Sequence, residues 1–174
     1  MVTFATLCYL GQRNKILLQR KAPGLFGEGR WNAPGGKMLP GELPERAAVR
    51  EMLEETGLRV SGVRFNGILN FFLGNSKKLD QTVFVFSCKK SSGKIRGSSE
   101  GELMWFSVDA IPYREMWQDD RLWLPLLLDG KSFVGDFYFT KGYTEFLSHK
   151  IHRTRFADIG QACEPLSTLN LNRK

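Results

Sequence analysis

Three glutamates, Glu51, Glu54 and Glu55, stand at a spacing that would place their carboxylates on one face of a helix. Carboxylate oxygens suit Mg²⁺ and Mn²⁺, and substrate phosphates commonly complete a Mg²⁺ site. Carboxylates this close repel one another and raise their pKa values unless cations neutralise them. The pattern therefore predicts a divalent-metal site that hydrolyses a phosphoanhydride, with metal ions polarising the phosphoryl oxygens and activating water.

The glutamates belong to a longer segment, residues 36–58, with the sequence GKMLPGELPERAAVREMLEETGL. Pro44 suits the first turn of a helix and Gly57 suits the residue after its end, so we expect a helix over 44–56. In such a helix Arg50 can pair with Glu54, four residues later. The face opposite the glutamates is expected to be buried and consists of Val49, Met52 and Leu53.

A glycine-rich loop precedes this helix. Gly36 lets the backbone approach a ligand closely, and Lys37 supplies a cation for phosphate. Ala47 and Ala48 are expected to leave room for a bulky anion beside the acidic face. Most glutamate-rich helices are surface helices with a solvated charged face, and a short acidic motif alone would favour that interpretation here. This segment also has glycines, an arginine and further glutamates at defined spacings, which a short acidic motif lacks. We therefore favour a phosphate-binding site.

A second cluster lies further along the chain, at Trp117, Asp119 and Asp120. An aromatic ring beside two carboxyls could stack on a purine and hydrogen-bond its Watson–Crick edge, particularly if one carboxyl keeps a proton. The alternative is structural: the two aspartates begin a helix over 119–128, where acids interact favourably with the dipole, and Trp117 is a core residue. The residues alone leave both interpretations open.

The remaining sequence indicates one domain over residues 1–150 and a polar, basic tail over 151–174. We expect strands near 2–10, 16–20, 63–73, 81–88, 103–106 and 132–140, with a helical turn region at 109–116. The formal net charge of +7 is not gathered into a stripe, so no stable nucleic-acid partner is expected. His149 and His152 are expected to be surface residues. The sequence leaves the oligomeric state open.

Composition also bears on location. Cys8, Cys88 and Cys163 form neither a disulfide framework nor a zinc motif, so reduced thiols are expected. The N-terminus resembles a first strand more than a signal peptide, and no apolar stretch is long enough to span a bilayer. A cytoplasmic protein that does not contact membranes is the expectation.

Residues 36–58 resemble the Nudix box at each of its defined positions. The resemblance implies an α/β (α+β) fold in which a mixed sheet lies between helices. It also implies Mg²⁺-dependent hydrolysis of a nucleoside diphosphate linked to a further group, with Mn²⁺ as a possible substitute. Glu42 would steady the loop and helix, and Arg50 would act beside the metal site. The implied metal ligands are the Gly36 carbonyl, Glu51, Glu54 and Glu55, with Glu100 as a further ligand or general base.

Two further segments, GRWNAPGGK at 29–37 and IPYREMWQDDRLWLPLLLDGKSF at 111–133, resemble the MutT-like oxidised-purine nucleoside triphosphatases, which hydrolyse 8-oxo-dGTP and related nucleotides. Asn70 stands where that subfamily has an aromatic pocket residue. Phe71 and Phe72 are adjacent, and a register slip would alter which side chain faces the pocket; Phe72 is the expected contact. The implied substrate contacts are Phe26, Asn32, Lys37, Phe72, Trp117, Asp119 and Asp120. The alternatives are another nucleotide substrate, such as an ordinary NTP, a dinucleotide or a nucleotide sugar, or a binding module without catalysis.

Overall fold

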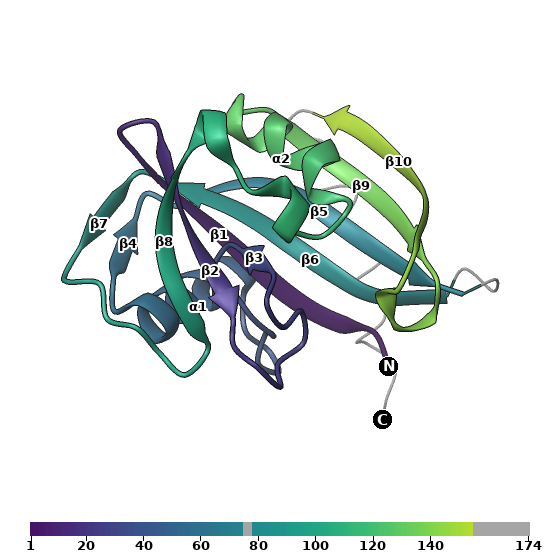
Figure 1. Cartoon of the computed structure of the whole chain (residues 1–174), viewed down its shortest axis with the longest axis horizontal. Helices are drawn as coiled ribbons and strands as arrows, with labels where there is room; N and C mark the ends of the chain where they lie inside the picture. The colour runs from purple at the N-terminus through teal and green to yellow at the C-terminus, as the bar shows by residue number, and fades with distance from the viewer. Residues whose placement is uncertain (75–77, 155–174) are drawn as a thin grey trace.

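A large mixed β-sheet forms the centre of the chain (Figure 1). The structure is a computed structural model, and it describes residues 1–74 and 78–154. The strands are β1 (Thr3–Gln12), β2 (Lys15–Lys21), β3 (Trp31–Asn32), β4 (Arg59–Ser61), β5 (Arg64–Leu73), β6 (Lys78–Cys88), β7 (Lys90–Ser92), β8 (Gly101–Ser107), β9 (Ser132–Phe139) and β10 (Phe146–Thr154). The large sheet has the order β10-β9-β5-β6-β1-β2-β3, and β8 also pairs with β2. Strands β4 and β7 form a separate small sheet.

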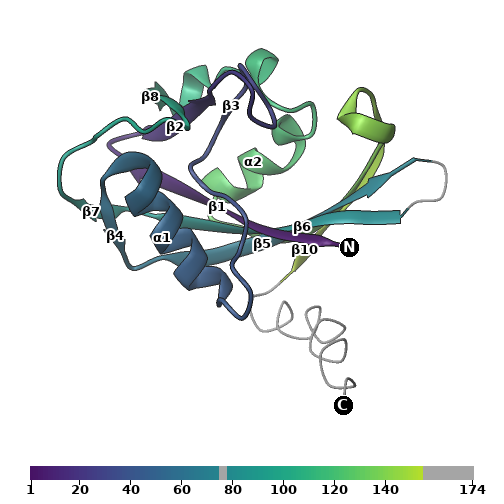
Figure 2. The same cartoon turned by 90° about the horizontal axis from the view of Figure 1, so that it is seen from below.

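The helices cover opposite faces of this sheet, as Figure 2 shows. They are α1 (Pro44–Thr56) and α2 (Asp120–Leu128), with single 3₁₀ turns η1 (Val108–Ala110), η2 (Tyr113–Glu115) and η3 (Lys141–Tyr143). Each face has its own hydrophobic core. One core contains Trp123 and Leu124 of α2, and the other contains Ala48 and Met52 of α1. The predicted mixed sheet between helices is therefore confirmed.

Helix α1 has the predicted bounds. It begins at Pro44, and Gly57 ends it in a left-handed conformation (φ 73°), with its N–H donating to the Leu53 carbonyl. The predicted buried face is wrong in part, because Leu53 is exposed. Ala47 and Ala48 are fully buried, so they do not provide open space for an anion. The face that α1 turns to the sheet therefore lies closer to its glutamates than the spacing of its apolar residues suggests.

The predicted strands are present, and the first two form a hairpin whose turn residues Arg13 and Asn14 both have positive φ. Sequence analysis missed β10, whose residues alternate too weakly to mark a strand. Because β10 runs to Thr154, the sheet continues past the expected domain boundary at residue 150. His149 and His152 are exposed on this strand, as expected. Cys163 and the rest of the tail from 155 onward lie outside the described residues.

Two smaller features concern the cysteines and the helices. Cys8 and Cys88 are free thiols whose sulfurs lie 3.8 Å apart in the core. Within residues 1–74 and 78–154, the structure contains no helix with the length and apolar character that a bilayer crossing requires.

Candidate active site

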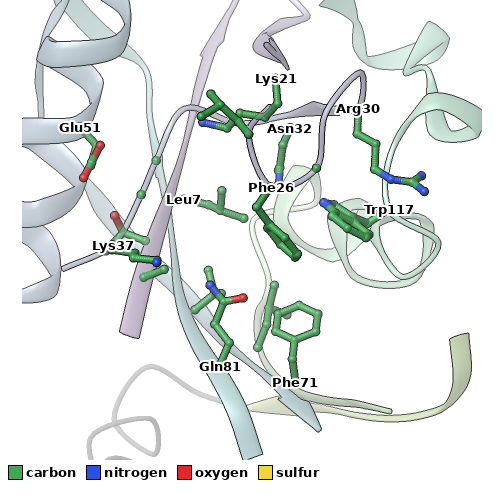
Figure 3. A pocket seen from close by; sticks show the side chains of 18 of the residues that line it. Leu7, Lys21, Phe26, Arg30, Asn32, Lys37, Glu51, Phe71, Gln81 and Trp117 are labelled. Carbon is green, nitrogen blue, oxygen red and sulfur yellow. The ribbon is translucent and has the colours of Figure 1, made fainter. Parts of the chain in front are cut away.

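A cavity of about 570 Å³ opens between the loop before α1, strands β1, β5 and β6, and the segment that leads into α2 (Figure 3). Most of the residues selected from the sequence line it, although they come from distant parts of the chain. These are Phe26, Asn32, Gly36, Lys37, Arg50, Glu51, Glu55, Glu100, Trp117, Asp119 and Asp120. The α1 carboxylates border one end of the cavity, and Trp117 lies at the other.

Arg50 organises the acidic end. Its Nε and Nη2 atoms donate to the two carboxylate oxygens of Glu42, each at 2.8 Å. Its Nη1 donates to Glu51 at 2.7 Å and to Glu54 at 3.0 Å, so the predicted Arg50–Glu54 pair is present. The paired arginine, assisted by the Leu39 N–H, lowers the pKa of Glu42 to about 2. Glu42 thus fixes the loop to the helix, as the resemblance implies.

Glu54 lies outside the cavity lining. Its side chain is 57% exposed, compared with 12% for Glu51, and Arg50 holds it at the rim. The three glutamates therefore share a helix face but have different environments. Of these three glutamates, Glu51 and Glu55 line the cavity and Glu54 does not.

Glu55 is almost completely buried, and two groups hold its carboxylate. Lys21 Nζ donates to Oε1 at 2.9 Å, and the Gly35 N–H donates to Oε2 at 2.9 Å. Burial raises the pKa of Glu55, while Lys21 and Gly35 act in the opposite direction. Lys21 also lies 3.5 Å from Glu100, so it connects the helix to the loop before β8. The nearby Glu51 charge raises the Glu55 pKa as well.

The donors at this end suit a hard divalent cation. Gly36 packs so tightly against Glu51 that a Cβ on it would lie 2.8 Å from the Glu51 carboxyl atoms, so only glycine keeps this backbone beside the carboxylate. The Gly36 carbonyl accepts one hydrogen bond, from the Thr6 N–H, and a carbonyl has a second lone pair. Among the described residues, no three His, Cys, Asp or Glu side chains converge on one point. Arg50 and Lys21 form ion pairs with these glutamates.

The two aspartates at the other end are buried at the start of α2. Asp119 accepts a hydrogen bond from Trp123 Nε1 at 3.0 Å through Oδ2, and its Oδ1 is buried with no protein partner in the described chain. Burial raises the pKa of Asp119 to about 6. Burial, and then the charge of Asp119, raises the pKa of Asp120 well above its usual range. Both carboxyls therefore keep a proton up to a higher pH than an exposed aspartate does.

The structural interpretation of this cluster holds only in part. The aspartates do begin a helix, but the Asp119 side chain makes no capping bond, and Asp120 accepts from the Trp117 N–H at 3.0 Å. Trp117 is half-buried at the cavity and is not a core residue. Asn32 completes this end. Its Oδ1 accepts from Tyr9 and from the Ala33 N–H, which leaves the amide nitrogen to donate.

Aromatic side chains form the wall around Trp117. Phe26 is stacked on its ring at 5.2 Å, and the Arg30 guanidinium lies 4.6 Å from the ring centre. Tyr143 contacts Phe26, Trp117 and Phe71 through ring edges, with centroids 5.3–6.1 Å apart. These rings make this end of the cavity a slot with aromatic walls, and aromatic walls are common where heteroaromatic ligands bind.

Phe72 does not line the cavity. It is stacked on Tyr138 at 5.0 Å, whereas Phe71 lies in the cavity wall (Figure 3). Asn70 faces away from the cavity too, where it bonds Asp136 and Thr82. Successive strand residues face opposite sides, so the aromatic position expected near Asn70 is filled by Phe71.

Sequence reasoning missed Lys21, Arg30 and Tyr143. Lys21 carried no local signal, because its partners are 34 and 79 residues away in the sequence. Arg30 belongs to the segment GRWNAPGGK, two residues before Asn32, and this position indicates a cation beside the expected base contacts. Tyr143 is in a left-handed conformation (φ 61°) after β9, and only the fold brings it to Trp117.

Known proteins share this arrangement of sequence and fold. The NUDIX domain profile matches residues 1–127. The chain is 41% identical over 147 residues to the oxidized purine nucleoside triphosphate hydrolase of Danio rerio, an alignment that covers 84% of this chain and 92% of that protein. It is 42% identical over 135 residues to the protein of the same name from Mus musculus, covering 77% and 85%.

Among solved structures, the MutT protein of Bacillus halodurans superposes with a TM-score of 0.77 at 28% identity, covering 86% of this chain and 97% of that one. The profile match includes the glycine loop, helix α1 and both aspartates of the cavity. The chain therefore belongs to the NUDIX family of hydrolases.

Proposed function

We propose that this Nudix hydrolase cleaves nucleoside triphosphates to a monophosphate and diphosphate with the help of Mg²⁺, and that it prefers oxidised purine nucleotides such as 8-oxo-dGTP. One observation carries the proposal: a single cavity joins the α1 carboxylates to a slot lined by Trp117, Asp119 and Asn32. The names of the fish and mouse relatives support the same substrate class.

The proposed metal site comprises Glu51, Glu55 and the Gly36 carbonyl. We include Glu54, because it shares the Arg50 Nη1 donor with Glu51, and Glu100, because it lies beside Lys21. When bound, a divalent cation would polarise the phosphoryl oxygens and lower the pKa of the attacking water. Mn²⁺ is the expected substitute, since it takes the same oxygen ligands.

The protein's own residues orient the phosphates and the water. Lys37 and Arg50 line the cavity beside Glu51 and provide cationic donors for phosphate oxygens. Lys21 holds Glu55 in one orientation and lowers its pKa, which opposes the effect of burial. Glu100 is the proposed acceptor for a proton of the water if it does not bind metal, since its side chain is 43% exposed at the cavity edge.

The base is proposed to stack in the slot beside Trp117. An ionised carboxylate only accepts hydrogen bonds, whereas a protonated carboxyl also donates one. Asp119 and Asp120, whose pKa values are raised by burial, can therefore match both donors and acceptors on a purine edge. The free amide nitrogen of Asn32 adds a further donor.

A substrate panel tests this proposal. Competing 8-oxo-dGTP, dGTP, ATP, a dinucleotide and a nucleotide sugar in one reaction with Mg²⁺ ranks them by kcat/KM, and chromatography identifies the products. We expect 8-oxo-dGTP to rank first and to yield the monophosphate. If another nucleotide of the panel ranks first, that nucleotide is the substrate. Tight binding without turnover would indicate a non-catalytic binding module. We also propose a cytoplasmic location, because the three cysteines form neither a disulfide framework nor a zinc motif in the sequence.

A further inference from the structure

Gln81 is the polar exception on an otherwise apolar wall of the cavity. The residues that β5 and β6 contribute to the lining are Leu69, Phe71, Gln81 and Val83. Gln81 on β6 is the register partner of Phe71 on β5 and of Thr3 on β1. An amide at this place adds nothing to the hydrophobic packing of the wall.

The Gln81 amide is directed into the cavity. In Figure 3 it lies between Lys37 on one side and Phe71 on the other, with Trp117 beyond. Within the described chain it has no hydrogen-bond partner, and it is only half-buried. A carboxamide offers two N–H donors and one acceptor oxygen, all of which remain free here to bind a ligand.

Its position corresponds to the middle of a bound nucleotide. The cavity has a phosphate end at Lys37 and Glu51 and a base end at Trp117 and Asp119. In any nucleotide the sugar joins these two parts, so the sugar must pass between the ends. A sugar hydroxyl is both donor and acceptor, and a neutral amide matches both roles. The charged groups at the phosphate end, in contrast, suit phosphate oxygens.

We infer that Gln81 is a specificity-determining residue that hydrogen-bonds the 3′-hydroxyl of the nucleotide sugar. This hydroxyl is shared by deoxyribonucleotides and ribonucleotides, so the contact selects for an intact sugar edge without excluding either class. The inference rests on the proposed function, because it places a nucleotide across the cavity.

The test compares 8-oxo-dGTP with its 2′,3′-dideoxy analogue, using wild type and Gln81→Met. Methionine has nearly the same length as glutamine but has no amide. Loss of one neutral hydrogen bond corresponds to about a fivefold change in kcat/KM. We expect wild type to prefer the 3′-hydroxyl substrate by about fivefold, and Gln81→Met to cleave both substrates about equally. Gln81→Glu, which keeps a hydrogen-bonding oxygen at the same length, should retain a preference for the hydroxyl.

Gln118→Met is the matched control. Gln118 is exposed, outside the cavity lining, and accepts a hydrogen bond from the Phe146 N–H. The same change of side chain there should leave the preference for the 3′-hydroxyl intact. A preference that Gln81→Met leaves unchanged, or an equal loss on both sugars, would overturn the Gln81 inference.

Calorimetry also compares the binding of 8-oxo-dGMP with that of its 2′,3′-dideoxy analogue. Because these monophosphates are not hydrolysed, the contact is measured without turnover. Wild type should bind the monophosphate with the 3′-hydroxyl more tightly, and Gln81→Met should bind both alike. Absence of any hydrolysis of oxidised nucleotides would contradict the proposed function, whereas equal binding of both sugars by wild type would contradict the inference on Gln81.

Discussion

Lys21 Nζ lies 2.9 Å from Glu55 Oε1, and this ion pair joins strand β2 to helix α1 inside the cavity wall. The two side chains are only 16% and 4% exposed, so neither charge is well solvated. Breaking a buried pair from one side leaves an unpaired charge, which costs more than the pair itself contributed.

Lys21→Met should therefore destabilise the metal-free protein by about 3 kcal/mol in urea unfolding. Addition of Mn²⁺ should recover part of this loss, because a cation beside Glu55 replaces the lost ammonium. Lys15→Met on the same strand is the control. Lys15 is exposed, and its loss should change stability by less than about 0.5 kcal/mol. Equal stability of Lys21→Met and wild type without metal would show that the pair is not needed.

Gly36→Ala should impair catalysis without unfolding the protein. The added methyl would lie 2.8 Å from the Glu51 carboxyl group, which is the end of a flexible side chain and can move aside. We expect a fall in kcat of about tenfold or more, since small displacements of a metal ligand are costly, with a nearly unchanged melting temperature. At Gly97 a Cβ would meet nothing within 4 Å, so Gly97→Ala should retain activity. Full activity of Gly36→Ala would rule out Glu51 as a tightly positioned ligand.

Asp119→Asn should alter the pH dependence of stability. Because burial raises the pKa of Asp119 from 3.8 to about 6, its stabilising contribution is fully present below about pH 3.8 and is lost as pH rises through 6. The free energy of unfolding of Asp119→Asn, relative to wild type, should thus increase by about 2–3 kcal/mol between pH 4 and pH 7. Urea titrations at each pH measure it.

Asp109→Asn is the control for this experiment, because Asp109 is exposed and lies in η1, a different turn. Its difference from wild type should stay level over the same pH range. A level profile for Asp119→Asn as well would show that Asp119 titrates normally. Asp119→Asn should also lose selectivity for oxidised purines while keeping its requirement for a divalent metal.

Arg50→Lys should reduce both stability and activity. The guanidinium contacts Glu42 with two nitrogens while Nη1 binds Glu51 and Glu54, and a lysine ammonium cannot reproduce this fork. We expect a loss of about 1–3 kcal/mol in unfolding and about tenfold or more in kcat/KM. Arg46→Lys, at an exposed position of the same helix, should behave like wild type. Matching results for the two variants would contradict this role for Arg50.

The local parts of the site could be predicted from the sequence. Proline at the start and glycine at the end fix the bounds of α1, and side-chain spacing fixes the pairing of Arg50 with Glu54. The buried face of α1 could be predicted only in part, because it depends on how the helix lies on the sheet. Leu53 is exposed and Ala48 is buried for this reason.

The long-range parts of the site required the fold. Pairing of β2 with β8 places Lys21 opposite Gly101, which brings Glu100 to the cavity. Strand register likewise decides that Phe71, and not Phe72, lies in the wall. Neither relation leaves a trace in the local sequence, since the paired segments are far apart along the chain.

The proposed function places metal-dependent phosphoanhydride hydrolysis at the Glu55 end of the cavity. The most direct measurement is diphosphate release from 8-oxo-dGTP by wild type and Glu55→Gln, each with Mg²⁺ and with a chelator, with folding checked by circular dichroism. We expect turnover by wild type only with Mg²⁺ and a loss of about a hundredfold or more in folded Glu55→Gln. Turnover by Glu55→Gln at the wild-type rate, or by wild type in the chelator, would contradict it.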